Sequence, residues 1–466
     1  MKANIASEDL ESASPAQAKA AFLWDESFLW GLMACKALKE NGLLFDLIRS
    51  EEIKNGGLKA YSMLFVPGGW ASNKLKSLGD DGVEEIRRFI KDGGNYLGIC
   101  GGAGLATRDC MGLLNVKRKP TKERVPSFSG RIYLNTDEHP VWKGVTDNPG
   151  QAAEPVKTAA AAGHPVSSIF NVWWPSQFLI KDSGIKILAT YGNALPDSFS
   201  SDLNVGDIEA VGGWSELEDI YQINLDPGRL LHEPAVIESA SGGGRVVLSL
   251  VHFDTPGDRN GAVVLNNLWT YLDGRPAGQG IKKRETVTGL YKPDSGTLDL
   301  FSGLYDLCSE LISVGVRNFL WFWRNPMFLQ WRRGVRGLEY CTLFVMIKEI
   351  LEILRGCGPS RPGNRETKPA VSLTGDASSA AYNRFMTDCG LRIKELLTSF
   401  VDNAGRLLVL ERHSLRNGHI TYDRCDDPEI IKIRKALFSG SKSHGGLFKK
   451  LINEVDSVLF LLLKEA

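Results

Sequence analysis

The sequence NYLGICGGAGLA, residues 95–106, runs as an apolar strand into Cys100 and surrounds this cysteine with small residues. A helix-like pattern follows. This arrangement is typical of a nucleophile elbow, with cysteine in the place of serine. The glycines permit the close backbone approach that so tight a strand-to-helix turn requires. The start of the helix would bring N–H groups and partial positive charge to the sulfur, which lowers a thiol pKa and stabilises an oxyanion.

Two other interpretations of this segment stand beside the nucleophile. Cysteine is commonly buried as a small apolar residue, and glycine-rich turns between a strand and a helix also bind phosphate groups. A short glycine pattern by itself is a weak signal of either kind. Two further segments of the chain favour the nucleophile over these alternatives.

The first of them, residues 63–70, is a second buried strand that ends in Pro-Gly-Gly, and a helix is predicted after it over 82–91. Strand, loop, helix and strand in this order form a parallel sheet, in which the loops at the carboxyl ends of the strands line one crevice. We therefore expect Gly68 and Gly69 at the same sheet edge as Cys100. Their N–H groups can hold a developing oxyanion. The alternative is a plain tight turn.

The second segment is a late strand over 244–251, which is followed by His252-Phe-Asp254. A histidine at the end of a strand can act as general base toward a thiol, and a carboxylate two residues later can fix its tautomer and orientation. The alternative is a loop histidine with structural hydrogen bonds. The three segments occurring together, in this order, favour a Cys-His-Asp triad.

Together these segments resemble the class I glutamine amidotransferase-like superfamily. Within it they are most similar to the N-terminal amidotransferase-like domain of biotin–protein ligases and to stand-alone bacterial relatives of that domain. The similarity extends from about residue 19 to about residue 272 and rests on four motifs. These are VPGG at 66–69, GGNYLGICGGA at 93–103, HPVWKG at 139–144 and VVLSLVHFD at 246–254.

The resemblance implies an α/β fold of the flavodoxin-like kind, with a doubly wound, mostly parallel sheet. It also implies that Cys100 is the nucleophile, His252 its base and Asp254 the orienting acid. The family usually has glutamate at this third position. Aspartate keeps the negative charge but shortens the reach of the carboxylate by one methylene.

The resemblance further implies that the oxyanion donors are backbone groups of Gly68, Gly69 and Gly101. The usual Gly-Gly-Pro loop before the last strands is replaced by WWPSQ at 173–177, which changes the expected substrate contacts. Three side chains near the predicted crevice are candidates for substrate binding: Trp70, Trp174 and Gln177.

Composition and charge narrow the class of protein. The chain has 466 residues, too many for one ordinary domain. Its 43% hydrophobic content and zero net charge fit a soluble globular protein and argue against a nucleic-acid-binding surface over the whole molecule. No apolar run is long enough to span a membrane, and we expect no membrane contact. The eight cysteines form no CxxC pair, so we expect reduced thiols, no metal, no cofactor and a cytoplasmic location.

Changes in composition and residue pattern along the sequence divide the chain into five regions. They are a disordered lead-in over 1–18 without the features of a secretory signal, the α/β domain over 19–275, a helical region over 285–355, a flexible linker over 356–380 and a second helical region over 381–466.

Three features inside the α/β domain also carry predictions. Residues 148–163 are rich in alanine, proline and glycine and predict a loop. The polar insertion 197–214 either forms a lid over the site or covers a sheet edge, and we favour the sheet edge. Asp25, at the end of the first strand, either borders the crevice or caps the next helix, and we favour the cap.

Between residues 316 and 336, five arginines interleave with six aromatic side chains, and no acidic residue occurs. Three interpretations compete, and we favour them in this order. The segment is helical core with arginines that reach to solvent, a docking face for a protein partner, or a surface for anionic lipid. Pro326 would interrupt a long helix.

Two functional hypotheses follow. The first is a cysteine-dependent hydrolase or amidotransferase-like enzyme that acts on a carbon–nitrogen bond of a small-molecule amide through a thioester. The second is a catalytically silent module that binds a small ligand, or regulates, and contacts a protein partner through its helical region. The reactivity of the Cys100 thiol distinguishes them.

Overall fold

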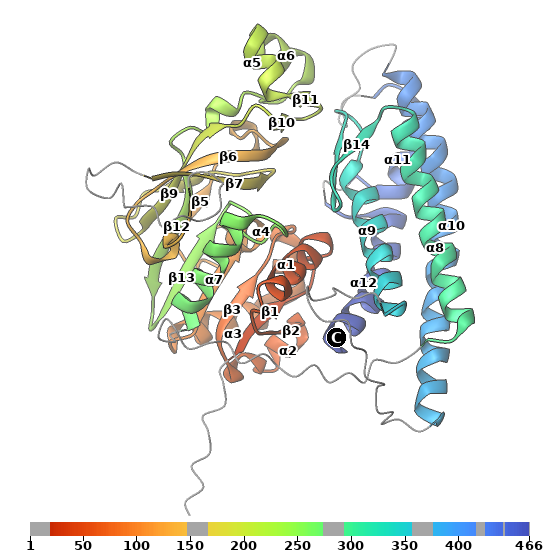
Figure 1. Cartoon of the computed structure of the whole chain (residues 1–466), viewed down its shortest axis with the longest axis horizontal. Coiled ribbons are helices and arrows are strands. Elements are labelled where there is room, and N and C mark those ends of the chain that lie inside the picture. The colour runs from red at the N-terminus through yellow and green to blue at the C-terminus, as the bar shows by residue number, and fades with distance from the viewer. Residues whose placement is uncertain are drawn as a thin grey trace, which may run out of the picture.

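The computed structural model describes residues 19–146, 166–273, 293–356, 376–415, 425–440 and 443–465. The N-terminal part is an α/β domain built on one large sheet, and the C-terminal part is a group of helices with a small β-hairpin (Figure 1). The predicted lead-in, the predicted loop 148–163 and most of the predicted linker lie outside the described residues.

Five parallel strands form the half of the sheet that carries the predicted site. They are β1 Lys19–Leu23, β2 Phe45–Ile48, β3 Tyr61–Val66, β4 Asn95–Ile99 and β13 Gly244–Ser249. Their spatial order is β2-β1-β3-β4-β13. Because helices cover both faces of such a sheet, these strands are rich in apolar residues, and Phe22, Phe65 and Leu97 are fully buried. This is the flavodoxin-like strand order, which places binding sites at the carboxyl edge of the strands.

Beyond β13 the sheet continues through antiparallel strands. In spatial order they are β12 Pro234–Ser241, β9 Lys186–Ala194, β6 Phe128–Thr136, β10 Phe199–Ser200 and β11 Leu203–Asn204, with β7 Val166–Trp173 paired to β6. The polar insertion 197–214 supplies β10 and β11 and then α5, Val205–Val211. Of the two alternatives for this insertion, the structure therefore shows the sheet edge.

Helices pack on this sheet as a doubly wound fold requires. They include α1 Leu29–Glu40, α2 Ser50–Lys54, α3 Ala71–Lys91, α4 Gly101–Leu105 and α7 Arg259–Asp273. A hydrogen bond from Asn266 to Asn41 (2.9 Å) joins α7 to the end of α1, while α2 packs against α3. The predicted α/β fold is confirmed.

Helix α3 is longer than the sequence predicts, because it begins at Ala71 and not at Gly82. Gly79 adopts φ 60° and ψ −173° inside this helix and kinks it. Gly79 and Gly82 each lower the local helix propensity. The sequence pattern therefore does not predict the first half of this helix.

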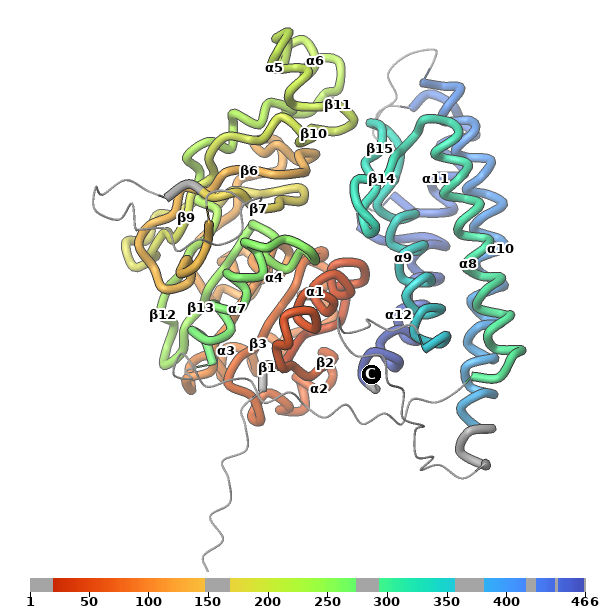
Figure 2. The backbone as a smooth tube through the Cα atoms, in the orientation of Figure 1, coloured from red at the N-terminus to blue at the C-terminus, as the bar shows by residue number. Residues whose placement is uncertain are grey.

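The described residues of the C-terminal part form helices and one hairpin. These are α8 Ser295–Arg317, β14 Trp321–Asn325, β15 Phe328–Trp331, α9 Gly337–Leu354, α10 Asp376–Ser414, α11 Pro428–Phe438 and α12 Gly446–Glu465. Helices α8 and α10 run side by side on the side away from the α/β domain, while α9, α12 and the hairpin lie toward it (Figures 1 and 2). The predicted helical character of this part is confirmed.

The segment 316–336 contains the hairpin β14–β15, so the helical interpretation of its centre is wrong. Pro326 cannot continue a helix, and Asn325 Oδ1 turns the chain by accepting hydrogen bonds from the N–H groups of Met327 (2.8 Å) and Phe328 (2.9 Å). The aromatic residues on both sides of this turn favour extended strands.

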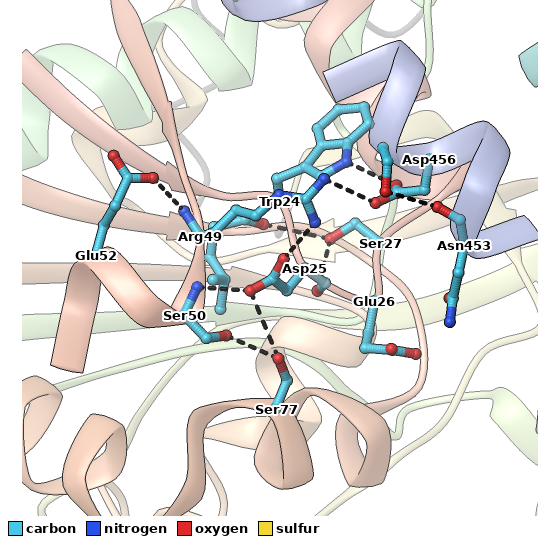
Figure 3. A network of polar contacts seen from close by, with 12 residues as sticks. Trp24, Asp25, Glu26, Ser27, Arg49, Ser50, Glu52, Ser77, Asn453 and Asp456 are labelled. Carbon is cyan, nitrogen blue, oxygen red and sulfur yellow. Dashed lines mark hydrogen bonds and ion pairs between the residues drawn. The ribbon is translucent and has the colours of Figure 1, made fainter. Parts of the chain in front are cut away.

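Helix α12 docks on the carboxyl ends of β1 and β2 through a polar network (Figure 3). Trp24 Nε1 donates to Asp456 (2.7 Å). Arg49 bridges Asp456 (3.1 Å) and Asp25 (2.7 Å), and its guanidinium lies 4.1 Å from the centre of the Phe460 ring. The preferred prediction for Asp25 is wrong, because the N-cap of the helix that follows it, α1, has no side-chain hydrogen bond. Asp25 instead accepts a hydrogen bond from the Ser50 N–H at the start of α2 (2.5 Å) and, through Arg49, helps to join the two parts of the chain.

Candidate active site

Cys100 occupies a sharp turn between β4 and α4, with φ 50° and ψ −101°. A positive φ costs a non-glycine residue about 1–3 kcal/mol. Two hydrogen bonds hold the turn: the Cys100 N–H donates to Ser249 O (2.7 Å), and the Gly104 N–H donates to Cys100 O (2.9 Å). The first of these ties the turn to the end of β13, the strand that precedes His252. Such a strained turn is the backbone form of a nucleophile elbow.

The predicted glycine loop touches this turn. A Cβ added to Gly101 would lie 1.9 Å from Gly69 O, so the approach requires glycine. Gly69 has φ 115°, a conformation that favours glycine, and Gly68 packs against the ring of Trp30. Within the described residues, the N–H groups of Gly69 and Gly101 have no hydrogen-bond acceptor. The structure therefore brings the loop and the elbow together with two N–H groups free.

His252 and Asp254 follow β13, and both are fully buried. His252 Nδ1 lies 2.9 Å from Asp254 Oδ1. Nε2, the other ring nitrogen, forms no hydrogen bond of good geometry with any described residue, but the Cys100 thiol lies beside it and interacts with it. Contacts of this kind often tighten only when a substrate binds. The three predicted triad residues thus meet at one sheet edge.

The surroundings of Cys100 and His252 favour their charged forms. Burial alone would raise the pKa of the Cys100 thiol, but the adjacent His252, together with the charge of Arg118, outweighs burial, and the thiol pKa is lowered. Burial would lower the pKa of His252, but Asp254 and the thiolate outweigh it and raise that pKa. In contrast, burial acts unopposed on Cys308 and raises its pKa. A thiolate beside an imidazolium is the reactive form of such a pair.

Aromatic rings cover the histidine. Trp30 stacks on His252 with ring centres 4.8 Å apart, and it also contacts Trp174 (5.5 Å) and Phe328 (5.2 Å). Phe328 in turn stacks on Trp173 (4.5 Å). Because Phe328 lies in β15, the C-terminal part helps to enclose the candidate site. Sequence reasoning missed Trp30 and Phe328, since no spacing pattern connects either residue to the elbow.

The three candidate substrate-binding residues differ in exposure. Trp70 follows the glycine loop and is 37% exposed. Trp174 has φ 49° and stacks on Trp331 with ring centres 5.1 Å apart. Gln177 is fully buried, donates from Nε2 to Arg229 O (3.1 Å), and its Oε1 has no partner among the described residues. Their contact with a substrate stays a prediction.

The described residues contain no group of three or more histidine, cysteine or acidic side chains that could hold a metal ion. The described cysteines are free thiols. Among the described helices, none combines the length and the apolar character needed to cross a membrane.

A match to one known protein family supports the resemblance seen in the sequence. Residues 48–121 match the family described as "Biotin-protein ligase, N terminal", and this range contains the glycine loop and the elbow. The chain is also similar to "Structure of PurLQS from Thermotoga maritima", with 14% identity over 55% of this chain and 100% of that chain and a TM-score of 0.36. A further similar structure is "Crystal structure of glutamine amidotransferase", with 17% identity over 55% and 99% and a TM-score of 0.33. The comparison with curated proteins found no match.

We expect the Phe328→Leu variant to loosen the cover of the site. It removes the ring that stacks on Trp173, and aromatic pairs of this kind contribute about 1 kcal/mol. The free energy of unfolding should fall by about that amount, and Cys100 should react faster with iodoacetamide. Phe319→Leu is the control, because Phe319 is 74% exposed and its loss should change neither quantity. Equal stability and reactivity in wild type and Phe328→Leu would contradict the assignment of a covering role.

Proposed function

We propose that this protein is a cysteine-dependent enzyme that cleaves the carbon–nitrogen bond of a small amide. One observation carries the proposal: a fully buried imidazole, His252, is held at Nδ1 by Asp254 while its Nε2 lies beside the Cys100 thiol. A histidine with one nitrogen fixed and the other next to a thiol of lowered pKa is arranged to move a single proton.

The proposed reaction has two stages. The Cys100 thiolate attacks the amide carbonyl carbon, and the free N–H groups of Gly69 and Gly101 hold the oxyanion, with each such donor contributing about 3 kcal/mol. The imidazolium of His252 gives its proton to the leaving amine as the carbon–nitrogen bond breaks and a thioester remains. Water then attacks the thioester, His252 takes the proton of that water, and the acid product leaves the regenerated thiolate.

A second candidate function is a module that binds a small ligand without turnover. The enclosure of the site favours it, because His252 and Asp254 are fully buried and Trp30 covers the ring. A site that only binds has no need of an activated thiol. The two candidates therefore differ in one measurable property, the reactivity of Cys100 as a function of pH.

The test is the rate of Cys100 alkylation by iodoacetamide, followed residue by residue with mass spectrometry from about pH 5 to about pH 10. We expect the midpoint of this rate to lie below the ordinary thiol pKa of 9.0. His252→Ala removes the cation that lowers the thiol pKa, so the midpoint should move to higher pH. The rate of Cys100 alkylation at neutral pH should then fall about tenfold for each pH unit by which the midpoint rises.

His413→Ala is the matched control, since His413 lies on the exposed side of α10 and its loss should leave the midpoint in place. An electrophilic glutamine analogue supplies a second readout, and it should label Cys100 in wild type much faster than in His252→Ala. A midpoint at or above 9, or equal labelling of wild type and His252→Ala, would overturn the enzymatic proposal in favour of the binding module.

A further inference from the structure

Two arginines lie beside the candidate nucleophile. The first, Arg118, ends β5, Val116–Arg118, which pairs with β8, Phe178–Ile180. Its guanidinium rests on Gly104 of α4: a Cβ added to Gly104 would lie 2.6 Å from Cζ and 2.7 Å from Nη1 of Arg118. Because Gly104 lies about one helical turn after Cys100, its missing side chain leaves room for a guanidinium close to the thiol.

The second arginine, Arg124, is close enough to Arg118 and to Cys100 for the charges of both to act on it. Burial and the positive charge of Arg118 lower the pKa of Arg124 to about 10, while the Cys100 thiolate acts in the opposite direction. Arg118 also acts on Cys100, where it lowers the thiol pKa. Arg124 Nε donates to the backbone oxygen of Lys119, which anchors its guanidinium. The two guanidiniums and the sulfur thus share one neighbourhood.

Neither arginine has an acidic partner among the residues that the structure describes. The neighbouring cation Lys119, in contrast, pairs with Glu233. Two like charges that are adjacent and partly buried repel each other and lose hydration. An anion that bridges them would remove both costs, and the fork of N–H donors on arginine suits the oxygens of a carboxylate or a phosphate. Both side chains are partly exposed, so such a group can reach them.

We propose that Arg118 and Arg124 form a subsite for an anionic oxygen group, a carboxylate or a phosphate, that the substrate carries near the amide bond. This inference rests on the proposed function and narrows its substrate to small acidic amides. The competing explanation is that the two arginines only lower the thiol pKa and touch no substrate. The two explanations differ in whether the site selects a reagent by its charge.

A pair of alkylating reagents measures that selection. Iodoacetate and iodoacetamide are nearly equal in size and differ by one negative charge. The ratio of their rates at Cys100 reports attraction for an anion, and the thiolate fraction cancels because the same thiol attacks both. We expect the ratio, iodoacetate over iodoacetamide, to fall about tenfold in Arg118→Gln and in Arg124→Gln, the effect of losing one charge-assisted hydrogen bond.

Arg108→Gln is the matched control, because Arg108 is an exposed arginine on the segment between α4 and β5 and its loss should leave the ratio unchanged. Arg118→Lys keeps the charge without the planar fork, so it should retain part of the selectivity. The circular dichroism spectra of Arg118→Lys and of the two glutamine variants should match that of wild type. A loss of selectivity then cannot come from a loss of folding.

Competition identifies the anion. Succinate or inorganic phosphate is added during labelling by iodoacetamide, and the anion that the subsite prefers should slow the labelling of wild type but not of Arg118→Gln. A rate ratio equal to that of wild type in both glutamine variants would overturn the subsite. That result differs from failure of the proposed function, in which Cys100 reacts slowly with both reagents and its rate is independent of His252.

Discussion

The Gly102→Ala variant is expected to lose the folded α/β domain. A Cβ on Gly102 would lie 1.9 Å from Val66 O and 2.7 Å from Val66 C. These are backbone atoms of β3, which is paired with β1 on one side and β4 on the other, so they cannot move aside at small cost. The carbonyl of Gly102 is also fixed, because Tyr96 Oη donates to it (2.7 Å). The cost should exceed about 4 kcal/mol, a loss that only a few kinds of single substitution cause.

Urea unfolding followed by tryptophan fluorescence measures this loss. Gly303→Ala is the control, because Gly303 lies inside α8 and its added Cβ would meet no atom within 4 Å. Alanine inside a helix is favoured over glycine by about 1 kcal/mol, so this variant should equal or exceed wild type in stability. If Gly102→Ala unfolded at the urea concentration of wild type, the close packing of the elbow on β3 would be refuted.

The elbow and its neighbours could be predicted because each is encoded in a short local pattern. A buried strand that stops at Cys100 among glycines predicts its own turn, and parallel strands bring their carboxyl ends to one edge. Gly69 and His252 follow two other strands of that parallel set, so their meeting with the elbow follows from the strand order alone. This prediction requires no knowledge of contacts between side chains that are far apart in the sequence.

The cover of the site could not be predicted in this way. Trp30 belongs to an apolar helix in which every large residue looks like core, and only the packed structure shows it stacked on His252. Phe328 reaches Trp30 from a hairpin whose aromatic and arginine-rich sequence also fits a helix. Arg118 becomes a candidate for the anion subsite only because strand β5 places its guanidinium against Gly104. Contacts between distant segments carry no local signal.

The C-terminal part of the chain contacts the glycine loop, Gly68–Gly69, as well as the aromatic residues that cover the candidate site. Lys449 of α12 pairs with Glu26 (2.6 Å), and a Cβ on Gly69 would lie 2.5 Å from Glu26 O. Lys74, which is fully buried, donates to Asp25 O (3.0 Å) just beneath this loop. The network that docks α12 is therefore continuous with the backbone that offers a free N–H group to the candidate site. Loss of α12 docking should thus change the reactivity of Cys100.

We expect the Asp456→Ala variant to separate α12 from the α/β domain. It leaves the indole N–H of Trp24 without an acceptor and deprives Arg49 of one of its two carboxylates. A buried N–H that is left without an acceptor costs about 1–3 kcal/mol, and the partly exposed Arg49 keeps its pairing with Asp25. Urea unfolding should show this loss, and iodoacetamide should reach Cys100 faster. Asp402→Ala, on the exposed side of α10, should stay within about 0.5 kcal/mol of wild type.

The effect of Asp456→Ala should also depend on pH. Burial raises the pKa of Asp456 from its ordinary 3.8 to about 6, although Arg49 opposes the shift. The folded chain therefore holds this proton more tightly than the unfolded chain, and the contribution of Asp456 to stability falls as the pH rises from about 4 to about 6. The stability gap between wild type and Asp456→Ala should narrow over that range. A gap that widened with pH would mean that the attraction of Arg49 outweighs burial, and that α12 is docked by a carboxylate ionised throughout.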